Sequence, residues 1–153
     1  MKKNFFYLIS IAIASFGALP TIAQDENVVT LSGNAYITTN SEKDAERTHA
    51  AVIDEPNCAI RNWNNKETVV SFYFSTAKSG KMDIALKAKG HSQIAISLLG
   101  KTKKIKLNSD TLTRVEVGTF KVNNSGYVKM DVRGVKINKG EDFGNVAAVI
   151  VGG

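Results

Sequence analysis

The sequence has little of the chemistry on which most enzymes depend. Cys58 is the only cysteine, and His49 and His91 are the only histidines. One cysteine cannot form an internal disulfide, and no Cys-x-x-Cys or His-x-x-x-His spacing is present to hold a transition metal. Neither a Gly-x-Ser-x-Gly motif nor a neighbouring nucleophile and base occurs. We therefore expect a protein that is not an enzyme, without catalytic residues, whose stability comes from packing.

The sequence also lacks a convincing helix of ordinary length and any internal repeat of fixed period. Apolar and polar residues alternate instead, most clearly in Thr68–Ser75 and Met82–Ala88, with turn chemistry at Gly80 between them. Period-two alternation is typical of a strand with one buried face, so the two segments predict a β-hairpin. Its inward positions are Val70, Phe72, Phe74, Met82, Ile84, Leu86 and Ala88.

Further strands are expected along the rest of the chain. The expected ranges are 28–38 with a kink at Gly33-Asn34, 93–98, 103–107, 114–122 with a bulge at Gly118, 127–133 after the hairpin turn Asn123–Gly126, and 145–151. The alternation of apolar and polar residues stops over residues 40–57, which are expected to form a surface loop with a helical turn capped by Ser41 and Asp44. Short strands separated by Gly-rich turns predict an all-β fold, an antiparallel two-sheet β-sandwich.

The N-terminus predicts export. Met1-Lys2-Lys3 is cationic, Phe5 to Leu19 is almost wholly apolar, and Thr21-Ile22-Ala23 offers small residues for cleavage. These features are typical of a secretory signal peptide, and the apolar run is shorter than a transmembrane anchor needs. We expect a signal peptide over residues 1–23, one domain over 24–153, secreted or periplasmic localisation and no membrane span after cleavage. An uncleaved anchor is the alternative.

The charge is modestly basic, with a formal net charge of +6. Lys101, Lys103, Lys104 and Lys106 form a local cluster. Such a cluster can attract phosphates or an acidic polysaccharide, or it can be the solvent face of an edge strand that must not pair with a neighbour. We favour the edge-strand interpretation and expect no nucleic-acid partner.

One segment combines the groups that bind sugars. Arg61, Asn62, Trp63, Asn64 and Asn65 are consecutive. A flat aromatic ring can stack on a pyranose, while amides and a guanidinium can bond its hydroxyls. The segment is therefore a candidate ligand-binding site. The competing interpretation is that Trp63 fills the core at the rim of the sandwich and the asparagines form turns. Tyr36 and Tyr73 are expected to be packing residues.

Several short motifs together resemble a known bacterial family. They are Gly33–Tyr36, Asn62-Trp63, Val70–Phe74 with Ser79–Lys81, Val117–Phe120, Ser125–Val128 and Val149–Gly153. Across the mature chain they look like the secreted domain of unknown function 5077, which in larger exported proteins precedes domain of unknown function 3472. The strand and turn order is also similar to galactose-binding-like jelly-roll carbohydrate-binding modules.

The resemblance implies two alternative functions and raises the question of a structural calcium. The first function is an exported, non-catalytic module that binds a polysaccharide or glycan. The alternative is a structural or docking domain that supports a partner domain or protein. Jelly-roll modules often hold a structural calcium through acidic residues on the first strand, whereas Ser32-Gly33-Asn34 stands near that place here. Only Asp142 remains as a candidate oxygen ligand, so no cofactor is expected and a structural calcium is the minor alternative.

Overall fold

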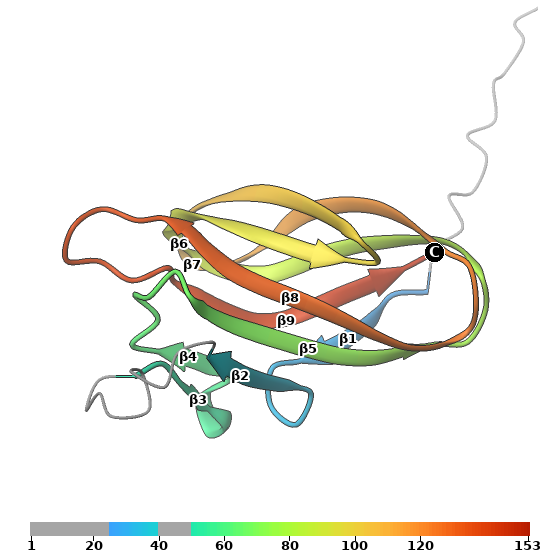
Figure 1. Cartoon of the computed structure of the whole chain (residues 1–153), viewed down its shortest axis with the longest axis horizontal. Coiled ribbons are helices and arrows are strands. Elements are labelled where there is room, and N and C mark those ends of the chain that lie inside the picture. The colour runs from blue at the N-terminus through green and yellow to red at the C-terminus, as the bar shows by residue number, and fades with distance from the viewer. Residues whose placement is uncertain (1–24, 40–49) are drawn as a thin grey trace, which may run out of the picture.

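The computed structural model describes residues 25–39 and 50–153, and these form an all-β fold (Figure 1). The strands are β1 (Asn27–Thr30), β2 (Ala35–Thr39), β3 (Val52–Asp54), β4 (Ala59–Arg61), β5 (Thr68–Thr76), β6 (Gly80–Leu98), β7 (Lys101–Val122), β8 (Gly126–Lys136) and β9 (Asn145–Gly152), with a short 3-10 helix η1 (Glu55–Asn57). The predicted signal peptide and the helical turn at Ser41 and Asp44 lie outside the described residues. Nowhere in the described ranges is there a helix of the length and apolarity that membrane crossing requires.

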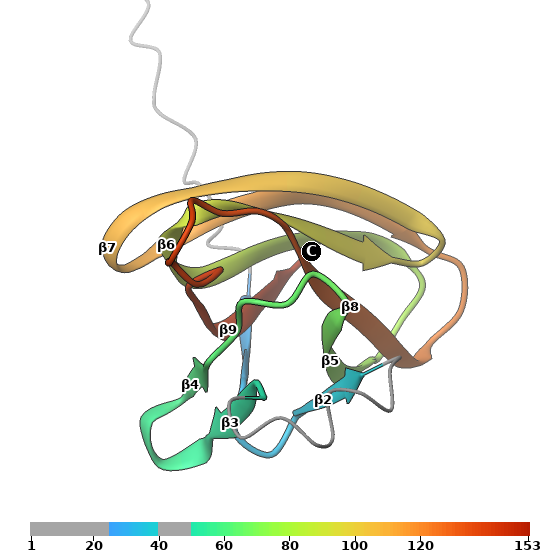
Figure 2. The same cartoon turned by 60° about the vertical axis from the view of Figure 1, so that its left-hand side comes forward.

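The main sheet is antiparallel and has seven strands in the order β1-β9-β6-β8-β5-β2, with β7 on the free side of β6. The long strand β6 changes partner along its length: residues 83–89 pair with β9 and residues 93–98 with β8. Strand β7 accompanies β6 through both halves. The sheet therefore curls almost closed, as a sandwich of two layers that share the bent β6–β7 pair (Figure 2).

The two layers are named here by their strands. Layer A contains β1, β9, the first half of β6 and the second half of β7. Layer B contains β2, β5, β8, the second half of β6 and the first half of β7. The bend lies at Gly90, where the β6–β7 register shifts. Gly90 has φ +142°, a backbone conformation that side chains with a Cβ rarely adopt.

The core lies between the layers and confirms the predicted register. Every inward position named above for 68–88 is buried, and Phe72, Leu86 and Ala88 have no exposed surface. The bulge at Gly118 is also confirmed: Gly118 pairs with Ile84 while Glu116 pairs with Ala85, so Val117 is the extra residue. In a bulge the extra residue bends its strand, which helps the sheet to curl.

The predicted hairpin over 68–88 is wrong in its pairing. Strand β5 lies between β2 and β8, and β6 pairs with β7, β8 and β9, so β5 and β6 are not neighbours. Residues 77–79 instead carry the chain from layer B to layer A. The turn Asn123–Ser125 carries the chain back from layer A to layer B, between β7 and β8, which also do not pair. The alternation of apolar and polar residues specifies which face of a strand is buried. It does not specify which strands pair with it, because the same face is buried whichever layer the strand joins.

Two further segments differ from expectation. The strand expected over 28–38 divides at residues 31–34 into β1 and β2, which belong to opposite layers. The described end of the expected surface loop contains β3 and η1, and β3 forms a second, two-stranded sheet with β4, which follows Cys58 at φ +46°. The edge-strand interpretation of the lysine cluster agrees with the structure, since β7 pairs only with β6.

Candidate functional site

The predicted sugar-binding segment links β4 to β5 at the end of the molecule where β6 and β7 bend. Arg61 forms an ion pair with Asp54 across the β3–β4 sheet. Asn62 is exposed and has φ +57°, a conformation that asparagine tolerates better than most residues. Asn64 is exposed, and the Asn65 side-chain oxygen accepts a hydrogen bond of 2.9 Å from the Glu67 amide.

Trp63 lies in the core, as the competing interpretation proposed. Its side chain has no exposed surface, and its ring lies 5.3 Å from the Phe143 ring, tilted by 52°. The Phe143 amide donates a 2.8 Å hydrogen bond to the Trp63 carbonyl. A ring with no free face cannot stack on a sugar, so the expectation that Trp63 provides the stacking surface is wrong. Sequence alone allowed both roles because the same amphipathic ring suits a core or a binding site.

A buried asparagine fixes β4 and the start of this segment to layer A. Asn145, the first residue of β9, accepts a 3.0 Å hydrogen bond from the Ile60 amide through its side-chain oxygen. Its side-chain nitrogen donates a 3.0 Å hydrogen bond to the Cys58 carbonyl. Two backbone groups of the β3–β4 unit are therefore satisfied by one side chain of the main sheet.

Arg61 and Asn62 open onto a groove of about 680 Å³. Besides these two, its lining comprises Asn57, Ala59, Ile60, Lys89, Gly90, His91, Ser109, Asp110, Leu112, Asp142, Gly144 and Asn145. The groove thus joins the β3–β4 unit to the bends of β6 and β7 and to the segment before β9. Of the five predicted site residues, Arg61 and Asn62 line the groove, whereas Trp63, Asn64 and Asn65 do not.

The wall opposite Arg61 is polar and partly charged. The His91 ring lies between two acceptors: Nδ1 is 3.1 Å from Asn108 Oδ1, and Nε2 is 2.9 Å from Asp110 Oδ1. The hydrogen bond to Asp110, then that to Asn108, raises the pKa of His91 above its ordinary value of 6.5. On the near side, the Asn57 amide first, and then Arg61, lower the pKa of Asp54.

Sequence reasoning missed most of this wall. Lys89, His91, Asp110 and Asp142 come from three separate segments, and none stands in a motif. Only the bend of β6 and β7, together with the β8–β9 connection, brings them beside Arg61. The Gly at position 90 was the one available signal, because glycine inside a strand pattern often marks a bend.

Exposed aromatic rings lie elsewhere, on the outer face of layer B. Tyr36 is 61% exposed and Tyr73 is 38% exposed, and their rings meet edge to face at 5.9 Å. Both were expected to be packing residues; they pack on each other, but both remain partly exposed and neither belongs to the buried core. Neither tyrosine lines the groove.

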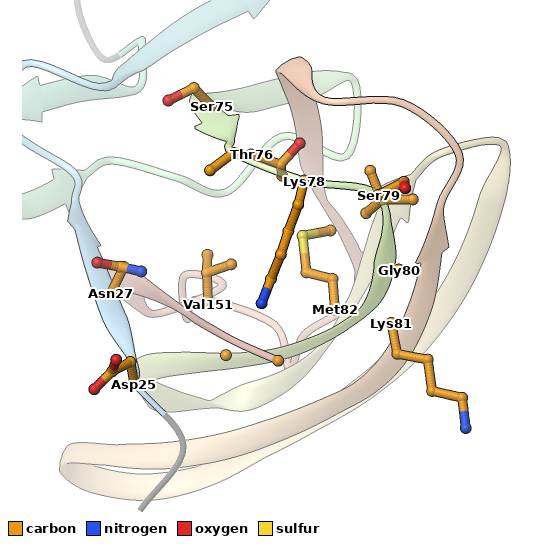
Figure 3. A pocket seen from close by; sticks show the side chains of 14 residues that line it. Asp25, Asn27, Ser75, Thr76, Lys78, Ser79, Gly80, Lys81, Met82 and Val151 are labelled. Carbon is orange, nitrogen blue, oxygen red and sulfur yellow. The ribbon is translucent and has the colours of Figure 1, made fainter.

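A second pocket, of about 440 Å³, lies at the opposite end, beside the C-terminus (Figure 3). It is bounded by the β5–β6 connection, the start of β1 and the end of β9. Figure 3 shows Lys78 extending into this pocket towards Val151, with Met82 beside it and Lys81 directed away. It contains none of the predicted site residues and no aromatic side chain. Within residues 25–39 and 50–153, no three His, Cys, Asp or Glu side chains gather as a metal site would require.

Fold and site together define a small antiparallel β-sandwich module with a polar groove at one end. Residues 29–153 match the family described as domain of unknown function (DUF5077), which covers most of the chain. The protein therefore belongs to this family. No curated protein sequence matches it.

Solved structures share the fold at low sequence identity. A family 35 carbohydrate-binding module from Cellvibrio japonicus has a TM-score of 0.57 at 10% identity, over 84% of this chain and 94% of that one. A family 35 module from Clostridium thermocellum has a TM-score of 0.53 at 16% identity, over 83% and 97%. The Podospora anserina mannanase that carries a family 35 module matches with a TM-score of 0.57 at 10% identity, over 83% of this chain but only 27% of the enzyme. The chain thus resembles whole binding modules and only a part of the enzyme, and at these identities the likeness shows the fold alone.

Proposed function

We propose that this protein is a non-catalytic glycan-binding module and that the groove beside Arg61 and Asn62 holds the sugar. The observation that carries the proposal is that two residues predicted for sugar binding line one hollow together with charged and amide groups from other segments. The fold shared with carbohydrate-binding modules supports it. Export to the periplasm or the medium remains part of the proposal.

The groove would bind a sugar through hydrogen bonds. The Arg61 guanidinium and the Lys89 ammonium supply donors, Asp142 and Asp110 supply acceptors, and the Asn62 amide supplies both. No Phe, Tyr or Trp side chain lines the groove, so none of these rings is available there to stack on a sugar. Hydrogen bonds that replace water contacts give a small net gain, and we expect dissociation constants of roughly 10 µM to 1 mM for a neutral or weakly acidic polysaccharide.

Two substitutions in the groove test the proposal. Asn62→Gly removes the amide while keeping a residue that adopts positive φ freely, and Arg61→Gln removes the charge. Arg114→Gln is the matched control, because Arg114 lies on β7 and pairs with Glu26 and Glu116, away from the groove. Affinity electrophoresis against a panel of neutral polysaccharides, with circular dichroism to verify folding, measures the effect.

We expect retardation of the wild type and of Arg114→Gln by at least one polysaccharide, and its loss in the groove double variant. Folded groove variants that are retarded like the wild type would remove the groove from the site. If no neutral polysaccharide retards the wild type, the docking-domain alternative is favoured.

A further inference from the structure

The outer face of layer B carries two rows of cations beside the bend. In the first row Lys106 of β7 pairs with Gln93 of β6, and Gln93 pairs with Lys136 of β8. The neighbouring Ile94 is buried in the core, so alternation directs Gln93 and its two partners outward. The two lysines therefore flank one amide, and they are two strands apart, about 10 Å.

A second row repeats this arrangement one step along the strands. Ala95 of β6 pairs with Lys104 of β7 and with Arg133 of β8. On β7 the cations of the two rows, Lys104 and Lys106, are two residues and about 7 Å apart. All four cations are exposed, and none forms an ion pair with another described residue. We call Lys104, Lys106, Arg133 and Lys136 the basic face.

The basic face continues into a hollow of about 600 Å³ at the bend. Its polar lining comprises Lys106, Lys136, His91, Ser92, Gln93, Asn108, Asn138 and Glu141. Glu141 is the only carboxylate there, and it accepts a 3.0 Å hydrogen bond from Asn138. His91, which separates this hollow from the groove, is already bonded to Asp110. The charge surplus of the hollow therefore comes from the two lysines.

Protection of an edge strand does not account for this arrangement. It would explain Lys104 and Lys106, since β7 is an edge strand. It does not explain Arg133, which is paired on both sides, with Val69 of β5 and Ala95 of β6. A cation in the middle of a sheet face has no neighbouring chain to repel. Arg133 and the three lysines of the basic face together form a positively charged surface, which is suited to attract a negatively charged ligand.

We propose that the basic face and its hollow bind an acidic polysaccharide, with the cations on its carboxylate or sulfate groups and the amides of Gln93, Asn108 and Asn138 on its hydroxyls. This inference rests on the proposed glycan-binding function but places it on a different surface from the groove. A polysaccharide fits better than a nucleic acid, because the hollow has no Phe, Tyr or Trp side chain on which bases could stack, and its one ring, that of His91, is hydrogen-bonded to Asn108 and Asp110.

The test compares polymers that differ only in charge. Affinity electrophoresis and titration calorimetry would use polygalacturonate against its methyl ester, and dextran sulfate against dextran, which separates carboxylate from sulfate recognition. The variant is Lys106→Gln with Lys136→Gln. The control is Lys87→Gln with Lys121→Gln, an equal loss of charge from exposed lysines of layer A.

We expect one acidic polymer to bind, its uncharged counterpart not to bind, and binding to weaken as salt rises. The basic-face variant should lose at least about tenfold in affinity, while the control keeps it. Equal losses in both variants, equal binding of charged and uncharged polymers, or equally tight binding of single-stranded DNA would each overturn the inference. The groove variants separate the two proposals, because they should lose neutral polysaccharides and keep the acidic polymer.

Discussion

Gly90 and Gly144 lie so close together that neither has room for a side chain. A Cβ on Gly90 would lie 2.9 Å from the Gly144 Cα, and a Cβ on Gly144 would lie 2.2 Å from the Lys89 carbonyl oxygen. The contact joins the bend of β6 to the segment before β9, and Ser92 reinforces it with a 2.7 Å hydrogen bond to the Phe143 carbonyl. Both proposed surfaces depend on this junction, since Gly90 and Gly144 line the groove and the adjacent His91 and Ser92 line the hollow.

Gly144→Ala should therefore destabilise the domain more than Gly140→Ala. The two glycines have similar φ values, +94° and +88°, but a Cβ on Gly140 meets nothing within 4 Å. Strain at positive φ should cost each variant about 1 to 2 kcal/mol, and the backbone collision should add about 1 to 3 kcal/mol for Gly144 alone. Urea unfolding measures the difference. Equal midpoints for the two variants would mean that the backbone at the Gly90–Gly144 contact can move apart without loss of stability.

Trp63, the only tryptophan, should report a buried environment. We expect its fluorescence to resist quenching by acrylamide in the folded protein and to become accessible in urea, because the side chain has no exposed surface. Trp63→Ala should cost about 3 to 5 kcal/mol of unfolding free energy. Trp63→Phe should cost less, since it fills part of the space and removes an indole N–H that has no hydrogen-bond partner among residues 25–39 and 50–153. Strong quenching in the folded state would contradict the core position.

His91 should titrate above 6.5, and Asp110→Asn should bring its pKa down. A histidine whose folded pKa is raised stabilises the fold fully below the unfolded value of 6.5, and the contribution disappears as the pH rises through the folded pKa. The difference in Tm between wild type and Asp110→Asn should thus be larger at about pH 5.5 than at about pH 8.5. NMR titration checks the pKa, with His49→Gln used to assign the second histidine. Identical titrations in both proteins would show that the His91–Asp110 pair does not form in solution.

Export should remove the apolar N-terminus near Ala23 or Gln24. The apolar run ends before this point, and Asp25-Glu26 begins a polar sequence. Intact-mass measurement of material recovered from the periplasm or the medium gives the cleavage position. Exported protein that retains residues 1–23 would instead indicate the membrane-anchored alternative.

The limits of sequence reasoning follow from which interactions are local. The inward register of Phe72 and Ile84 was predictable because alternation along one strand determines it. The pairing of β5 with β8 was not, because any neighbour that buries the same face satisfies the pattern. Arg61 and Asn62 were found because they are adjacent in sequence. His91 and Asp110 stand 29 or more positions further on and meet the groove only through the bend at Gly90, so no local pattern indicated them.

Asn145 should prove essential for holding the groove together. Asn145 is only 6% exposed, and its side chain forms hydrogen bonds with both the Ile60 amide and the Cys58 carbonyl. Asn145→Ala leaves these two groups without their partner, which should cost about 2 to 4 kcal/mol of unfolding free energy. The Ile60 amide should then exchange its hydrogen faster, because β4 is no longer fixed to β9 by this contact.

Two comparisons make the Asn145 result specific. Asn145→Asp keeps an acceptor for the Ile60 amide but sets a carboxylate against the Cys58 carbonyl, so Ile60 should stay protected while the domain loses stability. Asn138→Ala, which removes only the exposed hydrogen bond to Glu141, should change stability by less than about 0.5 kcal/mol. If Asn145→Ala left the exchange rate at Ile60 unchanged, other contacts would have to hold β4 in place.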